Sequence, residues 1–552
     1  MSTPTPSNAV VLDRLSYAWP DGSPALDAVS GSFGAGRTGL VGRNGSGKST
    51  LLRLIAGEIA PTSGHLIAHG EVAYLPQRLT LDTNARVAEL LGVAGPLDAV
   101  RAIAAGDVDP ARFDAVGDDW DIEARSEASL AEAGLDPSFL DRTVGELSGG
   151  EAVLVAIAGI RARRAPITLL DEPTNNLDRE ARKLLSAMVR SWQGTLVVVS
   201  HDVALLDLMD DTAELYGHEL SVFGGPYSEW RAWLDAEQEA ARQAEREAAQ
   251  TLKKEKQQRI DAEVKLARRA RTARKAEIEK RVPKIVARGR RMAAQVSAGK
   301  LRTEVGEKEA TARSAWDEAG RRVREDDSMS IELPDPGVAR SRRILTLADT
   351  GESARSWIVQ GPERVALIGR NGVGKTTLLR RIVAEEQAGA EGGPDDRGPR
   401  DETPAARVAW ERHTDRVGYL PQRMDGLDDA ASAMSTVAAR APGVPEKELR
   451  NRLARLLIRG GTADRAIGSL SGGERFRVAL AALLLADPAP HLVVLDEPTN
   501  NLDLDTVDQV VEALRAYRGA VLVVSHDDAF LDRLDLDLTL ELDPVEGLRQ
   551  VG

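Results

Sequence analysis

The segment GRNGSGKST occupies residues 42–50, and it returns as GRNGVGKTT at residues 369–377. Both fit G-x-x-x-x-G-K-[ST], the phosphate-binding loop, in which backbone amides and a lysine bind the phosphates of a nucleotide. A short apolar strand pattern precedes each loop and a helical pattern follows it, which is the context that this motif requires. The sequence therefore predicts an α/β fold with two nucleotide-binding domains in one chain.

Four further motifs occur twice, in the same order. They are YLPQR (74–78 and 419–423), LSGGE (147–151 and 470–474), LLDEPTNNLD with its variant VLDEPTNNLD (169–178 and 494–503), and VVVSHD with its variant LVVSHD (197–202 and 522–527). Self-similarity over this length indicates two homologous domains. We place these domains at residues 1–230 and 330–552, with a linker at 231–329.

The two copies differ in length at two places. From Lys48 to Gln77 is 29 residues, whereas Lys375 to Gln422 is 47, and the extra 18 lie in a Gly-, Pro- and acid-rich run at 385–404 that predicts a surface loop. Between the glutamine and LSGGE the first copy is 22 residues longer. The breaks within 92–117 fit a small protruding arm and a plain loop equally well.

Composition bounds the class of protein. A chain of 552 residues with 42% hydrophobic and 29% charged residues fits a soluble protein of several domains. No apolar run approaches the ~18–20 residues that cross a bilayer, and the N-terminus lacks a signal-peptide pattern. The absence of cysteine excludes a disulfide framework and thiolate chemistry. We expect a cytoplasmic protein, which would need a separate membrane partner for any role in export.

The two phosphate loops are expected to bind ATP and Mg²⁺. Lys48 would contact the β- and γ-phosphates and the Ser49 hydroxyl would ligate Mg²⁺, with Lys375 and Thr376 in the same roles in the second copy. The predicted nucleotide-binding residues of the loops are Gly42, Asn44, Gly45, Gly47, Lys48, Ser49, Thr50, Gly369, Asn371, Gly372, Gly374, Lys375, Thr376 and Thr377.

Two adjacent carboxylates follow an apolar strand pattern in each copy. Asp171 and Asp496 are expected to hold Mg²⁺ through water, and Glu172 and Glu497 are placed to polarise the attacking water. A plain acidic turn is the alternative, and the neighbouring phosphate loop argues against it.

The five ordered motifs resemble those of the ATP-binding cassette superfamily, in which two domains face head to tail and bind two ATP between them. This resemblance implies two composite ATPase sites. It implies that His201 and His526 take part in catalysis, that Gln77 and Gln422 contact nucleotide and Mg²⁺, and that LSGGE of each copy completes the site of the other, through Ser148, Gly149, Gly150 and Glu151 and through Ser471, Gly472, Gly473 and Glu474. Tyr17 fits the adenine-stacking aromatic of the family. The second copy has no aromatic between residues 331 and 349, and Trp357 is expected in the core.

A basic segment separates the two copies. Residues 251–302 hold 18 Lys and Arg against 5 acids, a charge of +13 in a chain whose net charge is −14. This asymmetry is typical of a nucleic-acid contact, although a solvated helical face has the same composition. Residues 239–280 contain neither Gly nor Pro and favour a long helix. Pro283, Gly289 and Gly299 interrupt the pattern, so we expect a helical hairpin with its tip at 282–300.

The start of this linker carries Tyr227, Trp230, Trp233 and Leu234 about one helical turn apart, and we expect all four to anchor it. The candidate RNA-contacting residues are Lys284, Arg288, Arg290, Arg291, Lys300 and Arg302.

Twin cassettes with a long charged linker resemble the ABC-F family of ribosome-binding proteins. DEPTNNLD, GGPYSEW at 224–230 and PKIVARGRRMAAQVSAGK at 283–300 carry the resemblance. It implies a monomer whose cassettes pair with each other and whose hairpin enters the E site of the 70S ribosome, near 23S rRNA of the catalytic centre and the P-site tRNA. The tip is similar to antibiotic-resistance members, which implies ribosome protection. A housekeeping translation factor, an ATPase subunit of a drug exporter and a DNA-acting cassette ATPase are the alternatives.

Overall fold

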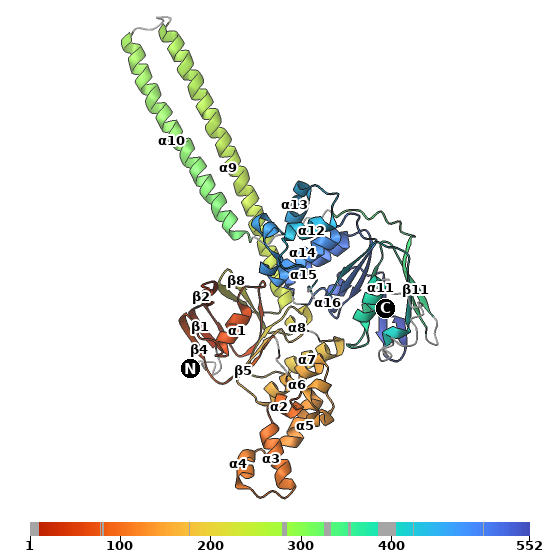
Figure 1. Ribbon diagram of the computed structural model, residues 1–552. Coiled ribbons are helices and arrows are strands. Elements are labelled where there is room, and N and C mark those ends of the chain that lie inside the picture. The colour runs from red at the N-terminus through yellow and green to blue at the C-terminus, as the bar shows by residue number, and fades with distance from the viewer. Residues whose placement is uncertain are drawn as a thin grey trace. The chain divides into compact units, whose positions relative to one another are not determined.

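The computed structural model describes residues 10–77, 79, 82–175, 177–278, 284–324, 333–350, 355–384, 404–422, 424, 426–500 and 502–551. The chain divides into two compact units, one formed by Met1–Tyr227 with Ser328–Gly552 and the other by Ser228–Asp327. The first unit contains both copies of the repeat, which we call the first and second cassette, and the second unit is the linker (Figure 1).

The first cassette is built on a six-stranded sheet with the order β5-β6-β7-β3-β8-β9. Its first five strands are parallel, and β9 is antiparallel to β8. Every residue of β6 and β7 is buried, because helices cover both faces of a parallel sheet. The strands are β3 (Gly36–Val41), β5 (Val72–Leu75), β6 (Ile167–Asp171), β7 (Thr195–Val199), β8 (Asp211–Tyr216) and β9 (Glu219–Phe223). A smaller antiparallel sheet has the order β2-β1-β4, from β1 (Val10–Ala18), β2 (Pro24–Phe33) and β4 (Ser63–Ala68).

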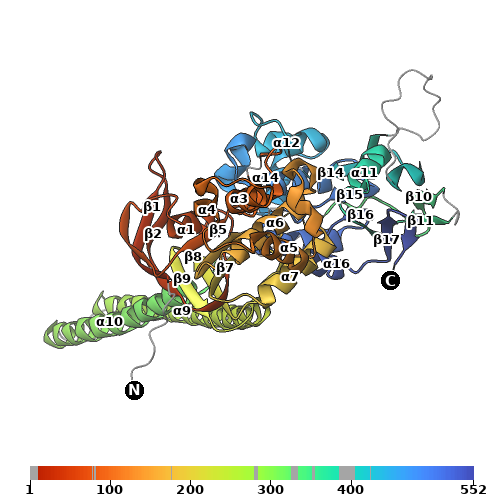
Figure 2. The same ribbon diagram turned by 90° about the horizontal axis from the view of Figure 1, so that it is seen from below.

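The second cassette repeats this topology strand for strand. Its sheets have the orders β14-β15-β16-β12-β17-β18 and β11-β10-β13, and the core strands of both cassettes are seen in Figure 2. The predicted α/β fold with two phosphate-loop domains is therefore confirmed. The strands are β10 (Arg343–Asp349), β11 (Ser356–Gln360), β12 (Arg364–Ile368), β13 (Val408–Arg412), β14 (Val417–Leu420), β15 (Leu492–Asp496), β16 (Ala520–Val524), β17 (Leu538–Asp543) and β18 (Gly547–Gln550).

Some helices of the cassettes directly follow a strand of the main sheet. The others lie between β5 and β6 in the first cassette and between β14 and β15 in the second. In the first cassette the helices are α1 (Lys48–Ile55), α2 (Val87–Leu90), α3 (Ala94–Ala104), α4 (Pro110–Val116), α5 (Ile122–Glu132), α6 (Gly149–Ala162), α7 (Arg179–Arg190) and α8 (Val203–Leu206), with the 3₁₀ turns η1 (Pro137–Asp141) and η2 (Val144–Glu146). In the second they are α11 (Lys375–Ala384), α12 (Ala433–Arg440), α13 (Glu446–Arg455), α14 (Gly472–Leu484), α15 (Leu504–Ala516) and α16 (Asp528–Asp532), with η3 (Pro404–Arg407), η4 (Gly460–Asp464) and η5 (Ile467–Ser469).

The extra residues of the first copy fold as an arm rather than as a plain loop. Helices α3 and α4 pack against each other there (Figure 1). Asp109 caps α4 by accepting a hydrogen bond of 3.0 Å from the Ala111 N–H, and Pro110 begins the helix, both common choices at a helix start. The longer run of the second copy, 385–404, lies outside the described residues except for Pro404.

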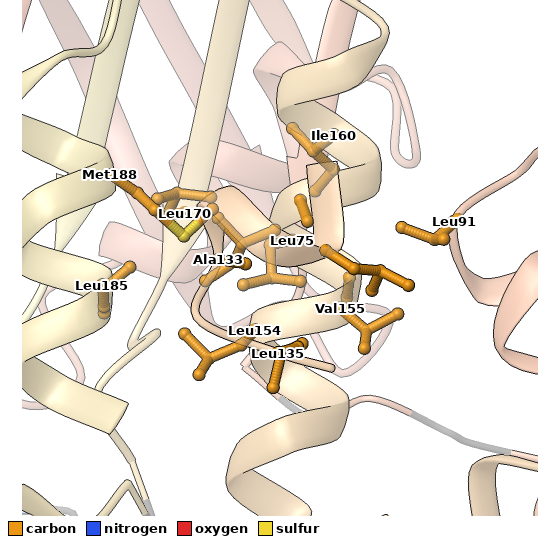
Figure 3. Packing of buried hydrophobic residues seen from close by; sticks show 14 of the residues in the cluster. Leu75, Leu91, Ala133, Leu135, Leu154, Val155, Ile160, Leu170, Leu185 and Met188 are labelled. Carbon is orange, nitrogen blue, oxygen red and sulfur yellow. The ribbon is translucent and has the colours of Figure 1, made fainter. Parts of the chain in front are cut away.

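An apolar cluster joins the helices of the first cassette to one face of its sheet. Leu75 and Leu170 on the sheet, Leu154 on α6, and Leu185 and Met188 on α7 point into it (Figure 3). Each of these five side chains is at most 2% exposed. The cluster fixes α6 and α7 against the strands that carry the site residues.

The linker is an antiparallel pair of helices (Figure 1). Helix α9 (Tyr227–Ile278) has 52 residues and α10 (Lys284–Arg322) has 39. Residues 284–300 of the predicted tip are helical, because α10 runs through Gly289 and Gly299, and residues 282–283 lie outside the described part of the chain, so the position of the tip stays a prediction. A glycine inside a helix costs only about 1 kcal/mol relative to alanine, and the neighbouring Ala, Arg, Lys and Met residues favour helix.

The predicted anchor at the start of α9 is correct in three of its four residues. Tyr227, Trp230 and Leu234 are 4–6% exposed. Trp233 is 48% exposed, so its prediction as an anchor was wrong. Trp233 points to a different side of α9 from the buried Trp230 and Leu234, and that side faces solvent. Among the described residues, no helix is long and apolar enough to cross a membrane.

Candidate functional site

The first phosphate loop connects β3 to α1. Gly42 and Gly47 have φ of 147° and 99°, a backbone region that favours glycine. A Cβ on Gly42 would lie 2.5 Å from the Leu215 carbonyl oxygen, so no side chain fits there. The Lys48 Nζ donates to the Gly42 and Arg43 carbonyl oxygens at 2.6 and 3.1 Å and lies folded over the loop. Burial lowers the pKa of Lys48, against the nearby carboxylates of Glu172 and Asp503.

The second phosphate loop has the same geometry between β12 and α11. Gly369 has φ of 148°, and a Cβ there would lie 2.6 Å from the Leu542 carbonyl oxygen. The Lys375 Nζ donates to the Gly369 and Arg370 carbonyl oxygens at 2.7 and 2.9 Å. It also lies 3.2 Å from His526 Nε2. In both loops the lysine therefore points into the loop, where a phosphate would bind.

The adjacent carboxylates stand at the carboxyl end of β6. Burial raises the pKa of Asp171 to about 6, against the lowering effect of the Ser49 hydroxyl. Asp171 Oδ2 lies 3.4 Å from the Tyr74 hydroxyl, and its buried Oδ1 has no hydrogen-bond partner among the described residues. Glu172 adopts φ of 52°, and its N–H donates to the Val199 carbonyl oxygen at 2.8 Å. Its Oε1 lies 3.0 Å from His201 Nε2.

The second cassette places the corresponding residues at the end of β15. Asp496 accepts from the Thr376 hydroxyl at 3.2 Å and from the Tyr419 hydroxyl at 3.3 Å. Burial raises the pKa of Asp496, and it raises the pKa of Glu497 to about 7. Glu497 has φ of 49°, the same unusual backbone as Glu172. Strained backbone of this kind is concentrated at functional sites.

The two histidines differ in their surroundings. His526 Nε2 lies 3.0 Å from Asn371 Oδ1 and 3.5 Å from Glu497 Oε1. Burial, together with the charges of Lys375 and Arg182, lowers the pKa of His526 to about 3. His201 Nε2 instead lies 3.0 Å from Glu172 Oε1. Because the pKa of His526 is lowered in this way, the site favours the neutral form of its side chain.

The donor set fits Mg²⁺. A hydroxyl next to a carboxylate, Ser49 with Asp171 and Thr376 with Asp496, leaves room for the waters and phosphate oxygens that this ion prefers. The described residues contain no group of three or more His, Cys, Asp or Glu side chains that could hold a metal by themselves. A buried carboxylate with a raised pKa and with an oxygen that has no hydrogen-bond partner among the described residues, as Asp171 has, suits the binding of a cation. Gln77 and Gln422 are exposed beyond β5 and β14, so their role as ligands stays a prediction.

The LSGGE segments begin the long helices α6 and α14. Ser148 and Ser471 cap these helices, each accepting from an N–H three residues later at 3.3 Å. Glu151 and Glu474 return the bond, accepting from the serine N–H at 2.7 and 2.8 Å. These capping boxes explain the Ser-x-x-Glu spacing within each domain. The predicted contact of these serines, and of Gly149, Gly150, Gly472 and Gly473, with a nucleotide stays a prediction.

Direct contacts join each phosphate loop to the other cassette. The Asn44 N–H donates to Asp503 Oδ2 at 2.9 Å, and the Asn371 N–H donates to Asp178 Oδ2 at 3.3 Å. Ion pairs surround these bonds. They are Arg43 with Asp505 at 3.3 Å, Arg370 with Glu180 at 2.6 Å, and Arg179 with Asp528. These ion pairs join residues that are far apart in the sequence, and no local sequence pattern indicates them.

Four aromatic residues were considered for the sites or lie beside them. Tyr17 is half-buried on β1 and packs edge-on against Trp19, with ring centroids 5.2 Å apart. Trp357 lies in the core of the second cassette, as predicted. Tyr74 and Tyr419 were missed as site residues, although the unchanged repeat of YLPQR marks both. Their hydroxyls orient the carboxylates of Asp171 and Asp496.

Known proteins match most of this chain. The ABC transporter family model matches residues 26–175 and 354–500. Tylosin resistance ATP-binding protein TlrC of Streptomyces fradiae is 31% identical over 565 residues, covering 95% of each chain. ATP-binding cassette sub-family F member 3 of Mus musculus is 28% identical over 90% of this chain, which spans 66% of that protein. Putative ATP-binding protein YdiF of Bacillus subtilis is 30% identical over 90% of this chain and 74% of its own.

Solved structures show a similar fold. The complex of archaeal ribosomal stalk protein aP1 with archaeal ribosome recycling factor aABCE1 contains a chain that matches with a TM-score of 0.55 at 19% identity, over 99% of this chain and 90% of that one. The RNase-L Inhibitor matches with a TM-score of 0.55 at 20% identity, over 98% of this chain and 90% of that one. At this identity the likeness concerns the fold alone.

Proposed function

Because this chain belongs to the ABC transporter family and, within it, to the ABC-F family of ATPases, we propose that it binds the ribosome and uses ATP to control the fit of its helical hairpin there. The observation that carries the proposal is the combination, in one chain, of two complete phosphate-loop sites with a linker segment, 251–302, of charge +13. ATP hydrolysis gives a use to the two phosphate-loop sites, and affinity for RNA gives a use to the basic linker segment.

Each nucleotide site would use the same set of residues. Lys48 and the loop amides bind the phosphates, and Ser49 with Asp171 holds Mg²⁺, which neutralises phosphate charge when bound. Glu172 activates the attacking water as general base, oriented by its N–H bond to Val199 and by His201. Lys375, Thr376, Asp496, Glu497 and His526 take these roles in the second site. LSGGE of each cassette completes the site of the other.

ATP binding would change the contacts between the cassettes. Asp503 and Asp178 hold amides of the opposite phosphate loops, and those amides also bind phosphate. A bound nucleotide therefore competes for, or rearranges, the same bonds. We propose that closure of the cassettes on ATP holds the hairpin in the geometry that fits the ribosome, and that hydrolysis releases it.

The hairpin carries the charge that RNA binding needs. Between residues 264 and 276 there is no acidic residue. The six cations there are exposed, and none forms an ion pair with a described residue: Lys265, Arg268, Arg269, Arg271, Arg274 and Lys275. Lys300 and Arg302 are also exposed, near Glu304 at 3.9 Å and Glu263 at 4.0 Å. Side chains of the other tip candidates, Lys284, Arg288, Arg290 and Arg291, lie outside the described residues.

We place the hairpin in the E site of the 70S ribosome, close to 23S rRNA of the catalytic centre and the P-site tRNA, in the cytoplasm. The similarity to a tylosin resistance protein over 95% of both chains supports antibiotic resistance by ribosome protection. A housekeeping translation factor is the second candidate, supported by the likeness to sub-family F member 3 of a mammal.

The test is co-sedimentation of Glu172→Gln/Glu497→Gln protein with 70S ribosomes. We expect pelleting with ATP and little without nucleotide. Lys48→Ala/Lys375→Ala in the same background is the matched control and should not pellet with ATP. Neutralising the six α9 cations should weaken pelleting in a salt-dependent way. If the Glu172→Gln/Glu497→Gln protein fails to pellet at low salt with ATP, the ribosome proposal is wrong. Susceptibility to macrolides with and without the gene then separates resistance from a housekeeping role.

A further inference from the structure

A cavity of about 1030 Å³ lies in the first cassette, far from its phosphate loop along the sheet. It is lined by Pro166 and Thr168 at the start of β6, whereas Asp171 ends that strand. Leu91, Ile160 and Met188 form an apolar floor that continues into the cluster of Figure 3. The polar lining consists of hydroxyls, arginines and the carboxylates of Asp119 and Glu132. A pocket of this size with an apolar floor and polar rim can hold one small planar group.

Four arginines line the cavity, and two of them are committed to neighbours. Arg125 is paired with Asp119 and Asp121, and Arg161 lies 3.1 Å from Ser191 Oγ. The other two, Arg163 and Arg164, have exposed side chains with no hydrogen bond or ion pair to a described residue. Two positive charges at the mouth are therefore left for a ligand.

The backbone fixes where these two arginines stand. The guanidinium of Arg163 lies against Gly92, at the place where a Cβ of that residue would be. Arg164 follows the end of α6 with φ of 52°, a position that glycine usually fills. An arginine in this position turns the chain out of the helix and stands at the cavity mouth.

The second cassette shows that the fold itself does not require this charge. Aligned on the shared GGE start of α6 and α14, the residues Arg161, Arg163 and Arg164 correspond to Leu484, Ala486 and Asp487. The arm of α3 and α4, which begins at the wall of the cavity, also has no counterpart among the described residues of the second copy. The cavity and its cations are thus additions to the first cassette.

We propose that this cavity binds one nucleotide unit of single-stranded RNA, with its phosphate on Arg163 and Arg164 and its base on the apolar floor beside Trp192. This inference rests on the proposed function in that ribosomal RNA is the source of the strand. Arginine binds phosphate through paired N–H donors, and unstacked bases are commonly held on aromatic or apolar surfaces. Trp192 packs against the apolar cluster and also lines the cavity, so it offers such a surface. The carboxylates of an acidic peptide could pair with the arginines, but they would not fill the apolar floor of the cavity.

The test is photo-crosslinking of the full chain to a 4-thiouridine-labelled single-stranded oligoribonucleotide and to 70S ribosomes, with mass spectrometry of the attached peptides. We expect a crosslink in the peptide that contains Trp192. Arg163→Ala/Arg164→Asp copies the second cassette and should reduce this crosslink at least tenfold. Lys183→Ala/Lys447→Asp changes the net charge equally at exposed sites elsewhere and should leave the crosslink unchanged. Trp192→Leu, which keeps an apolar packing group, should also weaken the crosslink.

The outcomes separate this inference from the proposed function. Crosslinks confined to the hairpin, or a Trp192 crosslink that survives Arg163→Ala/Arg164→Asp, would overturn the cavity proposal while ribosome binding stands. If Arg163→Ala/Arg164→Asp weakens 70S pelleting without any RNA crosslink near Trp192, an acidic protein segment is the ligand and the RNA assignment is wrong. Unchanged ATPase activity and melting temperature establish that each variant is folded, because none of these residues belongs to the nucleotide sites.

Discussion

The Asp503 carboxylate of the second cassette accepts a 2.9 Å hydrogen bond from the Asn44 N–H in the phosphate loop of the first. Its other oxygen accepts from the Thr506 N–H at 2.9 Å and so caps α15. One carboxylate therefore connects a helix of one cassette to the nucleotide site of the other. Asp178 repeats this arrangement, capping α7 at 3.0 Å and meeting the Asn371 N–H at 3.3 Å.

Removing this connection should uncouple the two sites. Asp503→Ala loses both bonds, and the lost cap alone costs about 1 kcal/mol of stability. We expect a lower ATPase rate and a loss of cooperativity in the dependence of rate on ATP concentration. Because the Asp503 bond is the shorter of the two, Asp178→Ala should have the smaller effect.

The control for this prediction is Asp109→Ala, which removes a helix cap in the arm with no link to either site. It should lower stability by a similar amount and leave ATPase kinetics unchanged. Cooperativity that persists in Asp503→Ala would show that these bonds do not couple the sites.

The two general bases should be separable by single substitutions. Glu172→Gln and Glu497→Gln each remove one base but keep the shape of the side chain, and a general base contributes about 10²–10⁴-fold to rate. Two equal and independent sites would leave each single variant about half of the activity, and because the sites are coupled through Asp503 and Asp178 we expect each single variant to keep less than that and the double variant to lose nearly all activity. Single-turnover ATPase assays with nucleotide binding measured in parallel would show this. Equal activity of the double variant and wild type would contradict the role of both glutamates.

The motifs that form the nucleotide sites could be predicted from the sequence, because their geometry is local. Glycines of the phosphate loop and carboxylates at a strand end need only a few neighbouring residues to define them. The ion pair of Arg43 with Asp505 joins residues 462 positions apart and has no local signal. Gly289 and Gly299 predict an interruption of the helix, whereas α10 runs through both of them because the long run of helix-forming neighbours outweighs two glycines.

Glycine at position 42 should be required for folding of the phosphate loop. Gly42→Ala would place a Cβ 2.5 Å from the Leu215 carbonyl oxygen at φ of 147°. We expect loss of nucleotide binding and a fall in stability of more than the ~1–2 kcal/mol that a left-handed backbone alone costs. Gly22→Ala is the matched control, with φ of 85° and no atom within 4 Å of its Cβ. If both variants lose the same stability, the close approach to Leu215 does not matter.

A buried histidine in the second cassette should make stability depend on pH. His491 is 5% exposed, and its Nδ1 lies 2.6 Å from the Thr414 hydroxyl. Burial lowers the pKa of His491 below the ordinary 6.5, and the nearby Arg416 and Arg342 lower it further. The unfolded chain therefore binds a proton below pH 6.5 that the folded chain excludes. The free energy of unfolding contributed by this residue is complete above pH 6.5 and falls as pH falls, by up to about 1.4 kcal/mol per pH unit.

Urea unfolding between pH 5 and pH 8 would measure this dependence. His491→Gln keeps a side chain that can bond Thr414 but does not titrate, so it should be less stable than wild type at pH 8 and lose less stability on acidification. The difference in unfolding free energy between wild type and variant should shrink as pH drops below 6.5, because only wild type has the ionisable group. His413 offers a control, since it lies in the same cassette and is less buried. A wild-type curve with the same slope as that of His491→Gln would show that His491 titrates equally in the folded and the unfolded chain.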